Sequence, residues 1–491
     1  MNFEFLKTIK IRKDSKVSMI VFVIFILVAI VIYKISTLIE SFNLAVVSIT
    51  LVFMLNLWWA CRNISKRYIF IGMNFMMFVF ILSRPLISEL RGQKWWYFNS
   101  EVIWKSLDAL LISFLVSLLG SIVADKVKFE VEYDKRSLSK YKKSKKCIYL
   151  LELLTFLVYF SVEINKYMIF KNLDYSSIYE NNSINYSIVV RLFYSLYVYM
   201  TMFIFAMMPK KREIAVVSTL YIISAVPSLL LGSRNDIVLR CIFVIVYYLF
   251  RHYYFKGDEE WILVQHKIIA VVVIPVAIIS LGAYNYLRDD ESIKNHSPFY
   301  MFVDFFYKQG TTYDTICQGF ENEEKLKGQK HVISYTFGEF IDYALYNTIS
   351  QKLFKTHSIG SGNSIEMATF SNSMAHHLSY IVLGGTYLQG HGRGTSFLIE
   401  VYMDFGWIGI VIYSFALGMS LILILKLCCS KNIIFRYISF TVLSSIWILP
   451  RYSATGFLKF IIMPQFWIIV VIVNVIRFIG EKIEMRKKYE E

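Results

Sequence analysis

The sequence predicts an all-α protein that crosses a membrane many times. Of its 491 residues, 56% are hydrophobic and only 18% are charged, whereas soluble domains carry about 25% charged residues because their surface must face water. The apolar residues gather in stretches of about 20, the length that an α-helix needs to cross a hydrocarbon layer about 30 Å thick. We therefore expect a polytopic membrane protein with about twelve transmembrane helices.

The first apolar stretch, residues 17–33, follows a segment rich in lysine and arginine. It lacks a small-residue cleavage site and further spans follow it, so we expect a retained signal-anchor whose N-terminus stays in the cytoplasm. Eleven later stretches share the same apolar character. They lie at residues 43–60, 68–83, 106–124, 148–161, 187–208, 214–231, 237–250, 268–286, 407–425, 433–449 and 457–476.

Basic residues test this order of spans, because every second loop should be cytoplasmic and rich in lysine and arginine. The loops after the second, fourth, sixth, eighth and tenth stretches, and the C-terminal tail, are basic in this way. They carry Arg62, Lys66 and Arg67, then residues 126–146, then Lys210, Lys211 and Arg212, then Arg251, Lys256 and Lys267, then Lys426 and Lys431, and last Arg477, Lys482, Arg486, Lys487 and Lys488. Both termini are therefore expected in the cytoplasm, and the net charge of +16 indicates membrane orientation instead of a nucleic-acid partner.

Three regions follow from this topology. Residues 1–286 should form the first nine transmembrane helices with short loops. Residues 287–406 should form a large loop or lid on the outer side, because the segment is polar and too long for a simple connection. Residues 407–491 should form the last three helices and a cytoplasmic tail. The cysteines fall mostly in spans or on the cytoplasmic side, so we expect no structural disulfide.

No cofactor or metal site is expected from the sequence. It contains neither a Walker loop nor a dinucleotide fingerprint, and it lacks the paired His and Cys spacing of a zinc site. His376 and His377 are adjacent, so on a helix they point about 100° apart and are poorly placed to hold one ion.

A polar turn, Gly232-Ser233-Arg234-Asn235-Asp236, separates two apolar stretches on the outer side. Gly, Asn and Asp suit turns, so one interpretation is a simple hairpin with interfacial charges. The other is that Arg234 binds an anionic headgroup, because its planar guanidinium group donates two hydrogen bonds to phosphate oxygens and stays protonated. Asp236 is a candidate substrate-binding residue of the same turn.

A glycine-rich segment, residues 390–396, precedes the apolar stretch at 407–425 and contains His391 and Arg393. Alternate glycines let a backbone approach a ligand closely and can present N–H groups to an anion. Thr395 or Ser396 could cap the helix that follows, and Glu400 and Asp404 would share one face of it. The alternative is a flexible loop that leads into an ordinary capped helix.

Arginines are unusually frequent on the outer side. Arg451 lies in a short outer turn before the last stretch, where an arginine alone is most often an interfacial anchor. Together with Arg234, Arg288 and Arg393, however, it departs from the positive-inside tendency. This excess indicates an anionic ligand on that side.

The segment from His391-Gly392-Arg393-Gly394 through Glu400 to Asp404-Phe405-Gly406 resembles the Wzy-type O-antigen or repeat-unit polymerases. The Gly232-Ser233-Arg234 turn also resembles that family, as does the plan of many helices with a large periplasmic loop before the last few. The order of helices and loops resembles the family over nearly the whole chain, whereas the sequence motifs resemble it only in short stretches. It implies a membrane-embedded glycosyltransferase of the C class.

The resemblance further implies transfer of a growing glycan from undecaprenyl diphosphate to a new lipid-linked repeat unit. Cations would hold the diphosphate leaving group and a base would accept the proton of the acceptor hydroxyl, with no cofactor or metal ion required. The assignments are diphosphate binding for Arg234, Arg393, Arg451 and Arg288, catalysis for Glu400, His391 and His377, and substrate binding for Asp404, His376 and Asp236.

The expected location is the bacterial inner membrane, with the active site facing the periplasm. The expected partners are the undecaprenyl-diphosphate-linked oligosaccharide, membrane lipid, and a chain-length regulator and flippase of the same pathway. Two other functions compete. An O-antigen ligase would transfer polymer to lipid A core, and a lipid-linked oligosaccharide flippase or other transporter would need a polar path across the bundle and related halves. The sequence shows neither feature of a transporter.

Overall fold

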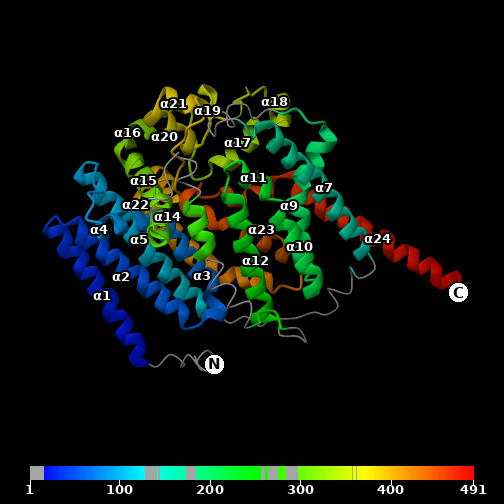
Figure 1. Cartoon of the computed structure of the whole chain (residues 1–491), viewed down its shortest axis with the longest axis horizontal. Helices are drawn as coiled ribbons and strands as arrows, with labels where there is room; N and C mark the ends of the chain where they lie inside the picture. Colours follow the sequence, from blue (N-terminus) through cyan, green and yellow to red (C-terminus); the bar gives the residue numbers. More distant parts are fainter. Residues whose placement is uncertain are drawn as a thin grey trace.

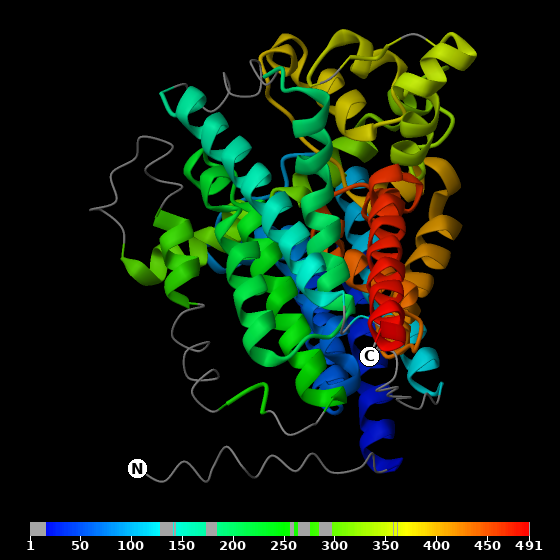
Figure 2. The same cartoon turned by 90° about the vertical axis from the view of Figure 1, so that its right-hand side faces the viewer.

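The computed structural model is helical throughout the part of the chain that it describes (Figure 1). Long helices form a bundle, and short helices cover one end of it (Figure 2). The described residues are 16–127, 141, 144–172, 184–255, 260–263, 275–283, 297–356, 358–360 and 362–490.

The first helices lie side by side along the bundle. Hydrophobic side chains dominate them, and short polar turns connect them, as at Ser41, whose Oγ atom accepts the backbone N–H of Leu44 at 3.4 Å and so caps α2. The helices are α1 (Lys16–Leu38), α2 (Phe42–Cys61), α3 (Ile64–Met77), α4 (Ser83–Leu90) and α5 (Ser100–Asp125).

A π-helical turn, η2 (Phe78–Leu82), joins α3 to α4, so that the helix is continuous from residue 64 to residue 90. The sequence predicts a span that ends at Ser83, because charged residues follow it. The helix continues because these side chains find partners; Arg84, for example, forms an ion pair with Asp314 at 2.8 Å. Such π-helical turns are rare and often lie at functional sites.

The middle helices form the other half of the bundle. A short turn with Gly232 at φ 94°, a conformation that favours glycine, connects the last two of them. They are α7 (Lys145–Phe170), α9 (Ile188–Ala206), α10 (Lys211–Ile223), α11 (Val226–Leu230) and α12 (Asn235–Tyr254).

The C-terminal helices complete the bundle, and the last of them projects from it toward the C-terminus (Figure 1). The first of them bends at Gly406, where φ is 62°. They are α22 (Phe397–Cys428), α23 (Ile433–Ser445), the 3₁₀ turns η4 (Ile446–Arg451) and η5 (Gly456–Ile462), and α24 (Pro464–Glu490).

A group of short helices lies at one end of the bundle, and we call residues 312–388 the cap (Figure 2). One further helix, α14 (Pro298–Gln309), precedes the cap and packs beside α4. The cap contains α15 (Thr312–Glu321), α16 (Glu323–Lys327), α17 (Gly338–Tyr346), α18 (Thr348–Phe354), α19 (Ile365–Phe370), α20 (Met374–Leu383) and α21 (Gly385–Leu388).

The predicted all-α, multi-pass membrane class is confirmed. The described residues contain 11 helices that are long and apolar enough to cross a membrane. The predicted stretch at residues 268–286 lies largely outside the described residues, of which residues 275–283 are helical. Figure 2 shows that the start of α1 and the end of α24 both lie on the side remote from the cap.

Among the described helices, α5 and α22 make the most extensive contact. A Cβ atom on Gly418 would lie 2.0 Å from the carbonyl oxygen of Ser117, and one on Gly120 would lie 2.2 Å from the carbonyl oxygen of Phe415. Ser113 and Ser414 form a hydrogen bond across the same interface at 3.2 Å. Small residues of this kind let the backbones of membrane helices approach closely.

We expect Gly418→Ala to destabilise the protein by about 1–3 kcal/mol, because the added methyl group meets backbone that cannot move aside. Thermal unfolding of the purified protein in detergent measures this. Gly385→Ala is the matched control, since a Cβ atom there meets nothing within 4 Å. Equal melting temperatures for the two variants would contradict the tight contact.

Candidate functional site

Arg84 is the second residue of α4, two residues after the π-helical turn ends. The helix packs tightly here against the end of α14, because a Cβ atom on Gly310 would lie 2.6 Å from the Cβ of Arg84. Ser83 reinforces the contact by donating its hydroxyl to the carbonyl oxygen of Phe306 at 2.8 Å. The position of Arg84 relative to the junction of α14 and α15 is therefore fixed.

Asp314 on α15 is the anionic partner at this junction. Its Oδ2 atom lies 2.8 Å from Nε of Arg84, and the Arg84 guanidinium group lies over the ring of Tyr307, 4.7 Å from its centroid. Burial raises the pKa of Asp314, and the nearby charges of Arg84 and Arg393 oppose this shift. Asp314 therefore lies between two arginines that are more than 300 positions apart in sequence.

Arg451, at the end of η4, reaches the same junction. Its Nη1 atom donates to Oε1 of Gln309 at 3.2 Å, next to Gly310. Its guanidinium group also lies 6.0 Å from the ring centroid of Phe80, one helical turn before Arg84. We call Arg84, Arg393 and Arg451 the arginine cluster.

Glu400 connects the segment that carries Arg393 to the segment that carries Arg451. Its carboxylate accepts the hydroxyl of Thr395 at 3.0 Å and the backbone N–H of Ala454 at 2.8 Å. Thr395 is two residues after Arg393, and Ala454 is three residues after Arg451. Because Glu400 is only 2% exposed, these bonds are shielded from water and fix both arginine-bearing segments.

Asp404 lies one turn further along α22, on the same face as Glu400, as the sequence predicts. Its carboxylate accepts the backbone N–H groups of Tyr335 at 3.0 Å and Thr336 at 2.7 Å, and the hydroxyl of Ser334 at 2.6 Å. Asp404 therefore ties the turn at residues 334–336 to α22.

The adjacent histidines of α20 each contact a tyrosine. Nδ1 of His377 lies 3.1 Å from the hydroxyl of Tyr335, and Nδ1 of His376 lies 2.8 Å from that of Tyr387. The Tyr335 hydroxyl donates to the carbonyl oxygen of Leu326 at 3.0 Å, which favours the His377 tautomer with the proton on Nδ1. Nε2 of His377 is buried and has no hydrogen-bond partner among the described residues.

His391 differs from the other candidate bases because it is exposed. It lies on the same loop as Arg393, between Gly390 (φ 87°) and Gly394 (φ 74°). The expected helix cap is not formed as predicted: Ser396 stands at the N-cap position without a capping hydrogen bond. Thr395 does not cap the helix either, because its hydroxyl donates to Glu400.

Arg234 directly precedes α12 and contacts the helical segment at residues 275–283. Its Nη1 atom donates to the carbonyl oxygen of Leu281 at 3.3 Å. Asp236, at the start of α12, is within electrostatic reach of Arg240, Glu163 and Lys166. Arg288 lies outside the described residues, so its predicted role stays a prediction.

The sequence analysis did not single out Arg84. A signal for it was present, because the predicted topology puts Arg84 and Arg91 in an outer loop, where the positive-inside tendency disfavours arginine. Arg91 forms an ion pair with Asp304 at 3.0 Å and lies over the ring of Tyr300, 4.8 Å from its centroid. It therefore anchors α4 to α14, whereas Arg84 belongs to the cluster.

The fold and the site define a class of protein: a multi-pass helical membrane protein with clustered arginines beside a helical cap. A family model described as O-antigen polysaccharide polymerase Wzy matches residues 18–482, nearly the whole chain. The chain belongs to this family, which makes it an O-antigen polymerase in the general sense and an enzyme of the glycosyltransferase kind. Neither a curated protein nor a solved structure matches it significantly.

The cap histidines predict a dependence of stability on pH. Burial lowers the pKa of His377 to about 4, and His376 acts in the same direction; burial also lowers the pKa of His376. In the unfolded chain both groups bind a proton near pH 6.5. Their contribution to stability is therefore complete above pH 6.5 and is lost as the pH falls toward 4.

We expect His377→Asn to weaken this acid sensitivity by up to about 3 kcal/mol, the value of a pKa shift of this size. The measurement is thermal unfolding in detergent between pH 4 and pH 8. His331→Asn, at an exposed position of the cap, is the control. The same pH dependence in wild type and His377→Asn would contradict the assignment.

Proposed function

We propose that the protein elongates a bacterial surface polysaccharide on the periplasmic side of the inner membrane. It transfers the growing glycan from undecaprenyl diphosphate to a hydroxyl group of a new lipid-linked repeat unit. Membership of the family supports polymerisation, and the convergence of Arg84, Arg393 and Arg451 at one junction supports a diphosphate leaving group.

The positive charge of the arginine cluster complements the negative charge of the diphosphate leaving group. Three guanidinium groups and the one carboxylate of Asp314 leave two positive charges, and guanidinium groups donate bidentate hydrogen bonds to phosphate oxygens. The negative charge on the diphosphate grows as the glycosidic bond breaks, so cations fixed in advance stabilise the transition state more than the ground state.

His391 is our candidate for the base. It is exposed on the loop that carries Arg393, whereas Glu400 and His377 are buried and both oxygens of Glu400 accept hydrogen bonds from the protein. In the proposed step, the bond between the sugar C1 atom and the diphosphate oxygen breaks and the electron pair leaves with the diphosphate. A new bond joins C1 to the acceptor oxygen, and His391 takes the hydroxyl proton.

The position of the cap supports the proposed sidedness. The two ends of the described chain lie on the side of the bundle remote from the cap, and the basic loops of the sequence are expected on the same side as the N-terminus. In the proposed orientation that side is cytoplasmic, and the arginine cluster faces the periplasm. A flippase that delivers repeat units and a chain-length regulator would then act on the same side.

Reconstitution with a defined undecaprenyl-diphosphate-linked repeat unit tests the function. We expect a ladder of products from wild type, and a loss of roughly 100-fold in rate for Arg84→Ala and for Arg393→Ala, because each removes a donor to the leaving group. Lys94→Ala, at an exposed position on the same side, is the control. Normal ladders from both arginine variants would rule out the proposed role of the cluster.

A deletion strain separates polymerase from ligase. Loss of a polymerase leaves lipid A core that carries a single repeat unit. Loss of a ligase leaves bare core and polymer that accumulates on the lipid carrier, and this second outcome would replace our proposal with ligase activity.

Glu400 provides a test of positioning against catalysis. In Glu400→Gln the amide oxygen can accept the Ala454 N–H and the amide nitrogen can donate to Thr395, so we expect most of the polymerisation rate to remain. Glu400→Ala leaves a buried N–H unpaired, which costs about 1–3 kcal/mol, and should lower both rate and stability. A loss of roughly 100-fold in Glu400→Gln, with an altered pH profile, would instead identify Glu400 as the base.

A further inference from the structure

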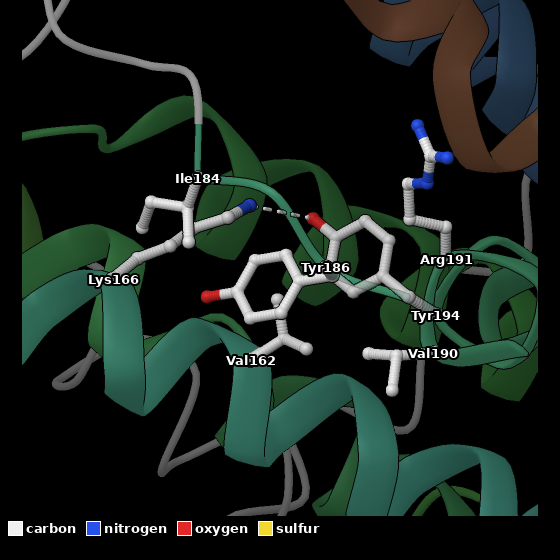
Figure 3. Close-up of a pocket in the computed structure, with 7 residues that line it drawn as sticks. All are labelled: Val162, Lys166, Ile184, Tyr186, Val190, Arg191 and Tyr194. Atoms are coloured by element: carbon white, nitrogen blue, oxygen red, sulfur yellow. Dashed lines mark hydrogen bonds between the residues drawn. The ribbon is translucent and has the colours of Figure 1, made fainter. Parts of the chain in front are cut away.

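A cavity of about 260 Å³ lies between the outer ends of α7 and α9 (Figure 3). Lys166 and Tyr194 meet inside it, Tyr186 forms one wall, and Val162 and Val190 form an apolar floor. Arg191 stands at the rim, with its guanidinium group directed away from Lys166. Figure 1 places α7 and α9 on the opposite side of the bundle from α4, which carries Arg84.

The polar groups of this cavity are held in position by the protein. Nζ of Lys166 lies 2.8 Å from Oε1 of Glu163 and 3.1 Å from the hydroxyl of Tyr194. An ammonium group has three donors, so these two partners leave one N–H of Lys166 for a ligand. The guanidinium group of Arg191 adds a second cation at an exposed position.

Apolar side chains surround the cavity on the outside of the bundle. On α7, Met168 is 57% exposed, and on α9, Ile188 and Val189 are 76% and 63% exposed. In a membrane protein such residues face hydrocarbon. The cavity therefore opens at the lipid boundary and combines cations, tyrosine hydroxyls and an apolar floor, which suits the phosphate end of a lipid.

A chain of hydrogen bonds links the cavity to the turn that carries Arg234. The second oxygen of Glu163 accepts the hydroxyl of Ser228 at 2.7 Å. The carbonyl oxygen of Ser228 accepts the backbone N–H of Ser233 at 3.0 Å, and Arg234 follows. This connection places the turn that carries Arg234 next to the cavity.

We propose that this cavity is a second lipid-phosphate site, which holds the diphosphate end of the incoming lipid-linked repeat unit while the arginine cluster holds that of the growing chain. The inference rests on the proposed function, in which each step needs two lipid-linked substrates. The volume lies below the range of roughly 300–1,000 Å³ of drug-sized ligand sites. It accommodates a diphosphate and the first carbons of its lipid, and the glycan extends toward the cap.

The test counts bound lipids on the full-length protein in nanodiscs of phosphatidylcholine, by native mass spectrometry with undecaprenyl diphosphate as the probe. We expect two bound molecules for wild type and one for Arg191→Glu, which reverses a rim charge, and for Val190→Trp, which fills the cavity. Lys171→Ala, at an exposed position directly after α7, should still bind two. One molecule on wild type, or two on both cavity variants, would overturn the proposal.

Kinetics and competition complete the test. The cavity variants should raise the KM for the lipid-linked repeat unit at least tenfold, with a smaller change in kcat. If phosphatidylglycerol displaces the second undecaprenyl diphosphate at equal concentration, the cavity is a phospholipid site and the proposal fails. Lipid binding can be measured without turnover. Two bound molecules without any elongation would therefore contradict the proposed function but would still support the second lipid-phosphate site.

Discussion

The arrangement of the arginine cluster depends on one buried carboxylate. Glu400 accepts hydrogen bonds from Thr395 and Ala454, which belong to segments that carry Arg393 and Arg451. Without this link, repulsion between like charges would favour separation of the two arginines. A carboxylate out of contact with water is costly unless its oxygens are hydrogen-bonded, so the same bonds that satisfy Glu400 also hold the cations at a fixed distance.

The cations near α4 and α14 have different partners from the cation between α7 and α9. Around α4 and α14, guanidinium groups lie against tyrosine rings and single carboxylates, as Arg84 does with Tyr307 and Asp314. Around α7 and α9, one ammonium group shares a carboxylate with a tyrosine. The first arrangement uses a planar guanidinium group with several fixed donors, and the second uses the compact charge of an ammonium group.

The sequence predicted the fold class because apolar stretches of membrane length are nearly independent of tertiary context. It also placed Glu400 and Asp404 on one face, since helical spacing settles that. It did not predict what they contact: Asp404 meets the backbone at residues 334–336, and no local pattern encodes a partner about 70 positions away. Arg84 was missed for a related reason, because hydropathy ended the third span at Ser83 while a distant carboxylate lets the helix continue.

The π-helical turn at Phe78–Leu82 has a consequence for how this helix can vary. A π turn holds an extra residue, and each residue of an α-helix turns the chain by about 100°. The segment before the turn can therefore pack in the register that the bundle requires, while the segment after it presents Arg84 in a different direction. Substitutions that change the packing of the first segment can therefore accumulate without changing the direction in which the second segment presents Arg84.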